Sequence, residues 1–252
     1  MSQPIEKKIL FINPLGTDVF DQPYMEMLQE IKDPGTQVDV VSFPRNGPAH
    51  IEYSCYEMMV MPELMKTIRR AEEEGYDAAV IGCFYDPGLR AAREIVSKMV
   101  VTAPAESCLR LAATLGDTLS IIVGRRKWIP EMRENVHKYG YGDKLASFKV
   151  LDMGVHDFQK DHAETNRRIL QAAEDAVKND GAEVILLGCT GEFGFYQEVQ
   201  RRVGVPVLDA GIVPFKYAEY LVGLRNQFGW AHSKIAGFEA PPEQEIRDWS
   251  LF

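Results

Sequence analysis

The chain has 252 residues, of which 46% are hydrophobic, so it can bury a substantial core in one large domain or two compact lobes. Its formal net charge is −9 at pH 7, and the charged residues are spread along the whole length. This balance argues against nucleic acid and against an anionic membrane as partners, because either would favour a basic patch. The expected partner is a small-molecule substrate.

The first eight residues are polar, and only a short apolar run follows them. An export signal needs a longer apolar core and a cleavage site of small residues, and this stretch has neither. The longest apolar stretches, at 78–85 and 184–187, are far shorter than a membrane span. We therefore expect a cytoplasmic protein.

In the first half of the chain, short apolar segments alternate with segments of helical periodicity. The segment 78–83 is apolar without interruption, which is typical of a parallel strand covered on both faces. We expect strands at 9–13, 38–43, 78–83 and 99–102, and helices at 53–61, 62–74, 88–98 and 107–115.

The same alternation starts again in the second half, with strands expected at 119–123, 147–153, 184–189 and 205–209, and helices at 128–139, 164–179, 195–203 and 214–223. Such alternation predicts parallel sheets built from right-handed crossovers. The expected fold class is therefore α/β, with two pseudo-symmetric lobes, each a parallel sheet flanked by helices. The first lobe would comprise residues 1–115, completed by 212–252, and the second would comprise 116–211.

The two halves correspond in detail at residues 74–83 and 180–189. Each segment has a helix end, a glycine, an acidic turn, an apolar strand and then Gly-Cys, with Cys83 in one and Cys189 in the other. Open parallel sheets bind ligands at the carboxyl ends of their strands. We therefore expect the two sulfurs to face each other across an active-site cleft between the lobes.

A pair of cysteines in such positions suits the inversion of a carbon that bears an acidic hydrogen. One thiolate would remove the proton from one face, and the other thiol would deliver a proton to the opposite face. Asp86 and Pro87 signal a helix start just after Cys83, and backbone amides at such a turn can hold a developing enolate. No cofactor is needed if the carbon acid is sufficiently activated.

The other cysteines and two of the histidines have simpler explanations than catalysis or metal binding. Cys55 and Cys108 fall inside helical segments, so we interpret both as packing residues. His156 and His162 flank a polar loop that could bind a metal, but a solvated surface loop accounts for them better. We therefore predict no metal site.

Several motifs follow one another in a characteristic order. They are Ile12-Asn13-Pro14, GCFYDPGL at 82–89, LGCTG at 187–191 and GVPVLD at 204–209. With them the chain resembles the hydantoin and allantoin racemases of the aspartate/glutamate racemase superfamily. The resemblance implies catalytic roles for Cys83 and Cys189, no pyridoxal phosphate and no metal, and a homo-oligomer.

The resemblance also implies that Asn13, Thr190 and the backbone beside both cysteines hold the substrate. Where hydantoin racemases tend to carry Thr-Thr, this chain has Val123-Gly124-Arg125-Arg126. The two arginines would pair with a substrate carboxylate or lie solvated at the surface. Aromatic residues beside Cys83 would line a pocket for an apolar substituent or pack against helices. The full set of expected substrate-binding residues is Asn13, Phe84, Tyr85, Gly124, Arg125, Thr190 and Gly191.

Racemisation of a 5-substituted hydantoin or a related cyclic ureide is the leading functional hypothesis, because the adjacent carbonyl and ring nitrogen activate that carbon. The alternatives within the same fold are racemisation of aspartate or glutamate and a maleate-type cis–trans isomerisation. Decarboxylation is less favoured, because it typically keeps only the second cysteine. From a different class, a two-lobed protein that binds a small molecule without chemistry stays open.

Overall fold

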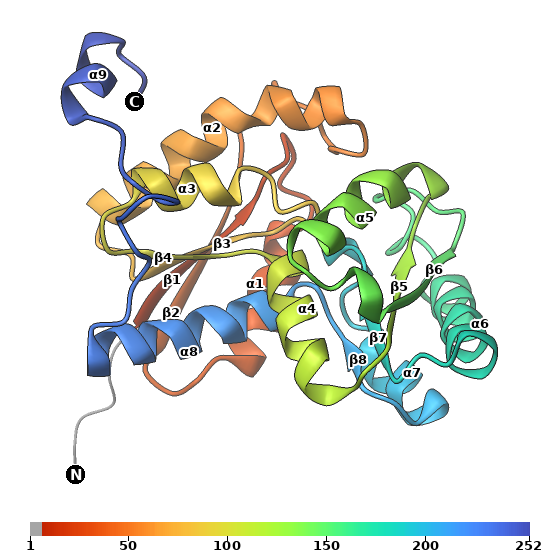
Figure 1. Ribbon diagram of the computed structural model, residues 1–252. Helices are drawn as coiled ribbons and strands as arrows, with labels where there is room; N and C mark the ends of the chain where they lie inside the picture. Colours follow the sequence, from red (N-terminus) through yellow and green to blue (C-terminus); the bar gives the residue numbers. More distant parts are fainter. Residues whose placement is uncertain (1–6) are drawn as a thin grey trace. The chain divides into compact units, whose positions relative to one another are not determined.

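Residues 7–252 are described by a computed structural model (Figure 1). Of these, 7–81, Pro87–Thr102 and Phe215–Phe252 form one unit, and Gly82–Asp86 with Ala103–Pro214 form a second. Residues 1–6, on which part of the export-signal argument and the start of the first predicted lobe fall, lie outside the described residues.

The sheet of the first unit has four parallel strands in the order β2-β1-β3-β4. Its core lies along β1 and β3, because the last five residues of β1 and all four of β3 are buried. In Figure 1, helices α2 and α3 lie together on one face. The strands are β1 (Lys7–Asn13), β2 (Thr36–Ser42), β3 (Ala78–Ile81) and β4 (Val100–Thr102).

Five helices belong wholly or largely to this unit. The longest, α2, buries Val60, Leu64, Ile68 and Ala71, a spacing that forms one apolar face. The helices are α1 (Asp21–Ile31), α2 (Ser54–Glu73), α3 (Leu89–Ile95), α8 (Ile212–Phe228) and α9 (Glu243–Asp248).

The second unit repeats the plan, with parallel strands in the order β6-β5-β7-β8. Its helices pack in two pairs, α4 with α5 and α6 with α7. The strands are β5 (Leu119–Val123), β6 (Leu145–Val150), β7 (Val184–Leu187) and β8 (Val207–Leu208). The helices are α4 (Pro104–Leu115), α5 (Ile129–Lys138), α6 (His162–Asp180) and α7 (Tyr196–Val203), with the 3₁₀ turns η1 (Arg126–Trp128), η2 (Gly142–Lys144) and η3 (Thr190–Glu192).

The predicted fold class is confirmed: both sheets are parallel, both are flanked by helices, and the strand order is equivalent in the two. Several boundaries differ. The strands expected at 78–83 and 184–189 end at Ile81 and Leu187, so each Gly-Cys stands in the turn beyond its strand. Helix α1 was not expected from the sequence.

The two helices expected at 53–61 and 62–74 are one continuous helix, with Pro62 in its interior. Proline has no N–H, so the carbonyl of Met58 loses its helical partner. Both residues are exposed, and water can satisfy that carbonyl without a break in the helix.

The division into units also differs from the predicted lobes, which placed everything up to residue 115 in the first. Helix α4 belongs to the second unit because Ala105, Cys108, Leu109 and Ala112 lie in its hydrophobic core. The turn Gly82–Asp86, which carries Cys83, belongs to the second unit as well.

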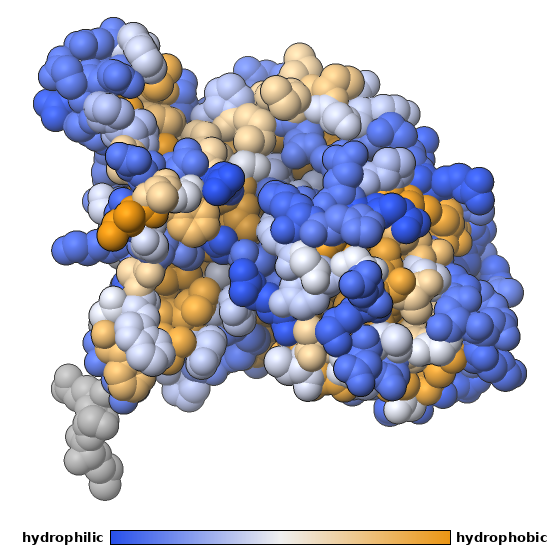
Figure 2. Space-filling model, in the orientation of Figure 1, coloured by the Kyte–Doolittle hydropathy of each residue, from blue (hydrophilic) through white to orange (hydrophobic). Residues whose placement is uncertain are grey.

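The surface on the face drawn in Figure 2 is mostly hydrophilic, with apolar residues in scattered patches. Among the described helices, none combines the length and the hydrophobicity that a bilayer crossing requires.

Candidate active site

Cys189 follows strand β7 in a turn that is packed against the neighbouring strand. The N–H of Gly188 donates to the carbonyl of Ile122 on β5 at 2.7 Å. A Cβ on Gly188 would lie 2.6 Å from that carbonyl oxygen, so a side chain cannot fit without a shift of the backbone. Glycine is therefore required just before the cysteine.

The turn after Cys189 brings a backbone donor to the sulfur. Cys189 has extended backbone angles and precedes η3, and the N–H of Gly191 donates to its Sγ at 3.4 Å. A donor at this position stabilises the charged thiolate relative to the thiol. The side chain is half-buried, so the sulfur is neither sealed in the core nor freely solvated.

Cys83 stands in the turn Gly82–Asp86, which is closed by the N–H of Asp86 donating to the carbonyl of Cys83 at 3.0 Å. The side-chain amide of Asn135 on α5 donates to the carbonyl of Tyr85 at 2.7 Å. Like Cys189, Cys83 is half-buried. The turn is thus attached to α5 by a buried hydrogen bond.

Asp86 attaches the same turn to α4. Its carboxylate accepts the N–H groups of Ala105 and Glu106 in the first turn of that helix, both at 2.8 Å, and the hydroxyl of Tyr139, also at 2.8 Å. Asp86 has a φ of 52°, in the left-handed region that few residues other than glycine adopt, although aspartate does so more often than most. These bonds offset the cost of that conformation.

One hydrogen bond joins the two cysteine turns directly. The hydroxyl of Thr190 donates to the carbonyl of Gly82 at 3.0 Å in a buried position. Thr190 is the residue after Cys189, and Gly82 is the residue before Cys83. The turns expected to carry the chemistry therefore lie side by side within the second unit.

Three buried carboxyl groups surround these turns. Burial raises the pKa of Asp86 to about 7, although the N–H groups of Glu106 and Ala105 oppose the shift. Burial raises the pKa of Asp209 to about 6 against the N–H groups of Gly211, Ile212 and Gly194. Burial, reinforced by the charge of Asp209, raises the pKa of Glu192 well above its usual range.

The substrate-binding residues expected from the sequence fall into two groups. Thr190 and Gly191 adjoin Cys189, and Phe84 and Tyr85 adjoin Cys83, with both aromatic side chains packed in the hydrophobic core of the second unit. Asn13 lies at the end of β1 in the first unit, where its amide donates to the hydroxyl of Ser42 at 2.8 Å and to the carbonyl of Thr17 at 3.3 Å.

Gly124 follows β5 and is enclosed by Trp128 and the backbone of Met153, each 2.4 Å from where a Cβ would lie. Arg125 is half-buried and Arg126 is exposed. The roles of these residues toward a substrate stay predictions.

The other cysteines differ from each other. Cys108 is fully buried in α4, and burial raises the pKa of its thiol well above the usual value, so it is a packing residue as expected. Cys55 is exposed in the first turn of α2, and the prediction that it packs is wrong. The turn lies at the N-terminal end of the helix, before its apolar face begins at Val60.

The loop with His156 and His162 contacts the Cys189 turn through Gln159, a residue that the sequence analysis did not single out. The amide of Gln159 donates to the carbonyls of Gly191 and Phe193 at 3.0 and 3.2 Å. His162 stacks on Phe195, with ring centroids 4.3 Å apart. Across residues 7–252, no three His, Cys, Asp or Glu side chains gather closely enough to hold a metal ion.

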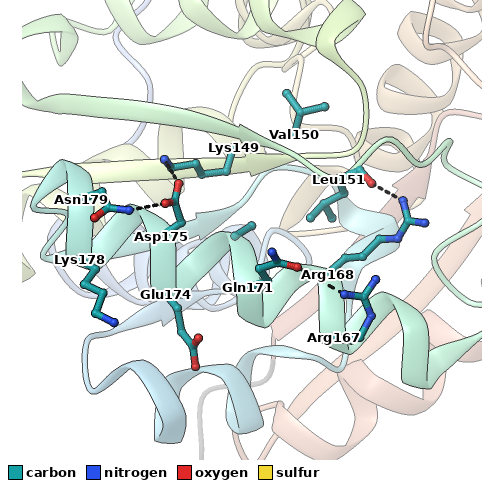
Figure 3. Close-up of a pocket in the computed structure, with 11 residues that line it drawn as sticks. Lys149, Val150, Leu151, Arg167, Arg168, Gln171, Glu174, Asp175, Lys178 and Asn179 are labelled. Atoms are coloured by element: carbon teal, nitrogen blue, oxygen red, sulfur yellow. Dashed lines mark hydrogen bonds and ion pairs between the residues drawn. The ribbon is translucent and has the colours of Figure 1, made fainter.

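A groove of about 560 Å³ lies elsewhere in the second unit, between β6 and α6 (Figure 3). Most of its cationic side chains already have anionic partners. Lys149 pairs with Asp175 and Asp180, and Arg168 pairs with Glu164 outside the groove. The groove contains neither Cys83 nor Cys189, and we do not assign chemistry to it.

Comparison with known proteins agrees with the sequence motifs. Residues 9–217 match the family described as Asp/Glu/Hydantoin racemase. The hydantoin racemase of Paenarthrobacter aurescens is 34% identical over 243 residues, which cover 94% of this chain and 99% of that protein. The hydantoin racemase of Rhizobium meliloti is 34% identical over 233 residues, covering 92% and 94%.

The fold has close counterparts among solved structures. The allantoin racemase from Klebsiella pneumoniae superimposes with a TM-score of 0.87 at 28% identity, covering 94% of this chain and 95% of that one. The allantoin racemase from Pseudomonas fluorescens gives 0.84 at 25% identity, covering 93% and 97%. The expected resemblance and the expected enzyme class, an isomerase of the racemase type, are confirmed: the chain belongs to the Asp/Glu/hydantoin racemase family.

Proposed function

We propose that the enzyme racemises 5-substituted hydantoins or related cyclic ureides, with Cys83 and Cys189 as the two acid–base groups. The observation that carries this proposal is the buried bond between Thr190 and Gly82, which holds the two cysteine turns next to each other. The similarity to hydantoin and allantoin racemases supports the substrate class.

The chemistry requires one thiolate and one thiol. The thiolate takes the hydrogen from carbon 5 of the ring, so a C–H bond breaks, an S–H bond forms, and the electron pair passes into an enolate at the adjacent carbonyl. The second thiol then delivers its proton to the opposite face and becomes the thiolate. The next turnover can run in the reverse direction, which explains why both groups should be the same residue type.

The carbon acid itself makes this reaction accessible to a thiolate. Carbon 5 lies between a carbonyl and a ring nitrogen, and the enolate delocalises its charge onto oxygen. The N–H of Gly191, which already contacts Cys189 Sγ, would favour the thiolate state of that cysteine. The reaction therefore needs no electron-sink cofactor.

A free acidic amino acid is a weaker carbon acid and would need strong recognition of its carboxylates. The candidates in this chain for that role are Arg125, half-buried, and Arg126, exposed. Cytoplasmic location and assembly into a homo-oligomer stay predictions from the sequence.

The test is incubation in deuterium oxide with single enantiomers of 5-benzylhydantoin, 5-methylhydantoin and allantoin, next to aspartate, glutamate and maleate. We expect loss of optical rotation and one deuterium at carbon 5 for a cyclic ureide, above the rate in an enzyme-free sample. Activity on aspartate, glutamate or maleate with none on the ureides would overturn the substrate class. Tight binding of a ureide without turnover would indicate a binding protein instead.

A further inference from the structure

We infer that Tyr139 and Gln159 are positioning residues, and that each serves one cysteine of the pair. Tyr139 acts through Asp86 on the turn that carries Cys83, and Gln159 acts on the turn that carries Cys189. The inference rests on the proposed two-cysteine function. It adds that two residues outside the motifs each position a different cysteine.

Tyr139 directly follows α5, and its hydroxyl donates to a carboxylate that is only 3% exposed. That carboxylate belongs to Asp86, whose own N–H donates to the carbonyl of Cys83. Because Asp86 has left-handed backbone angles, its conformation depends on the bonds that its side chain makes. Loss of the Tyr139 hydroxyl would loosen the turn three residues after the sulfur.

Gln159 contacts the second turn at Gly191, the residue whose N–H reaches the sulfur. Its amide donates to the carbonyls of Gly191 and Phe193, and the N–H of Gly191 is the donor to Cys189 Sγ. One amide nitrogen therefore holds the carbonyl of Gly191 and the carbonyl of Phe193 together, and this restricts the orientation of η3. The thiolate of Cys189 would therefore lose part of its stabilisation without Gln159.

The loop that carries Gln159 is itself well anchored. The hydroxyl of Thr165 donates to the carbonyl of Phe158 at 2.8 Å, and the Asp161 side chain accepts the N–H of Glu164 at 3.0 Å as the cap of α6. Gln159 thus has a fixed base from which it can position the Cys189 turn.

The two contacts come from different elements, so their effects should be separable. Tyr139 comes from the end of α5, whereas Gln159 comes from the loop between β6 and α6. The Thr190 hydroxyl, by contrast, connects both turns, and its loss should affect both cysteines.

The separation cannot be measured on the racemisation itself. The two enantiomers have equal free energies in water, so kcat/KM must be the same in both directions whichever residue is changed. We therefore place Tyr139→Phe and Gln159→Met in two backgrounds, Cys189→Ala and Cys83→Ala. In each background one cysteine remains to exchange the hydrogen at carbon 5 of one enantiomer.

The probe is deuterium uptake by each pure enantiomer of the best ureide, with the enzyme-free rate subtracted. In the Cys189→Ala background, Tyr139→Phe should slow uptake about tenfold, the order expected for one hydrogen bond to a charged group, and Gln159→Met should leave it unchanged. In the Cys83→Ala background the pattern should reverse. The matched control changes Tyr141→Phe and Gln171→Leu, which do not remove these contacts, should alter neither rate.

The outcomes distinguish the two proposals. If the one-cysteine variants exchange neither enantiomer, the two-cysteine function is wrong, and this inference with it. If they exchange one enantiomer each but Tyr139→Phe and Gln159→Met slow both backgrounds equally, positioning alone is overturned. Should Gln159→Met fail to fold, as judged by its melting curve, Gln159→Glu keeps the size of the side chain and removes the donor.

Discussion

The turns of Cys83 and Cys189 follow equivalent strands of one internal repeat, yet they are held in different ways. Cys189, its strand β7 and its turn all belong to the second unit. Cys83 follows β3 of the first unit, but its turn has its contacts in the second. The cysteine therefore has the same position in both halves of the repeat, but the hydrogen bonds that hold its turn differ.

The local sequences explain the difference. After Cys189, glycine at 191 allows a tight 3₁₀ turn whose own N–H reaches the sulfur. After Cys83, Asp86 supplies a carboxylate that binds the start of α4. The chemistry proposed for the two cysteines would thus depend on a backbone donor in one turn and on a buried carboxyl group near the other.

The largest effect should come from the glycine before Cys189. Gly188→Ala would push a methyl group against the backbone of Ile122, so we expect the free energy of unfolding to fall by about 3 kcal/mol. Gly181→Ala, at a helix end with φ of 70° and open space around it, should cost about 1 kcal/mol. Urea unfolding compares them, and equal losses would contradict the packing argument.

The next largest effect should be the pH dependence of stability that the buried carboxyl groups cause. A carboxyl whose pKa is raised by folding holds its proton more tightly when folded than when unfolded. Stability from Asp86 and Asp209 is therefore greatest near pH 4 and falls as pH rises, until about 6 for Asp209 and about 7 for Asp86. The melting temperature should be lower at pH 8 than at pH 5.

The two acids can be told apart in the same measurement. Asp86→Asn should reduce the slope over the whole range up to about pH 7, whereas Asp209→Asn should reduce it only below about pH 6. Glu164, whose pKa is lowered to about 2 by Arg167 and Arg168, titrates outside this window. A slope unchanged in both variants would mean that other groups control it.

The smallest expected effect concerns the link between the two turns. Thr190→Val removes the hydroxyl that donates to Gly82 and should cost about 1 kcal/mol of unfolding free energy, since it leaves a buried carbonyl without that donor. Thr190→Ser keeps the hydroxyl and should behave nearly as the unchanged protein. If the serine variant loses as much as the valine variant, the methyl group is what matters.

Much of the fold was predictable because its signals are local. Short apolar runs marked most of the strands, and the repeat at 74–83 and 180–189 indicated two similar lobes. Helix α1 was missed, since its sequence begins with Asp21-Gln22-Pro23 and buries only Tyr24 and Leu28. Pro62 led to the opposite error, a predicted break between two helices, because the single helix tolerates a proline on its exposed face.

The candidate site was predictable at the cysteines and much less so around them. Gly-Cys at two equivalent strand ends is visible in the sequence, and the place of Asp86 after Cys83 is visible as well. The bonds from Tyr139, Asn135 and Gln159 join residues 32 to 53 positions apart, and no periodicity encodes them. Such partners depend on how α5 and the loop before α6 pack.

The most direct test of the two-cysteine mechanism uses Cys83→Ala and Cys189→Ala with each pure enantiomer in deuterium oxide. We expect both variants to lose racemisation by about 10³-fold or more, and each to exchange carbon 5 of one enantiomer only, with opposite preferences. Racemisation at an undiminished rate by either variant would contradict the mechanism.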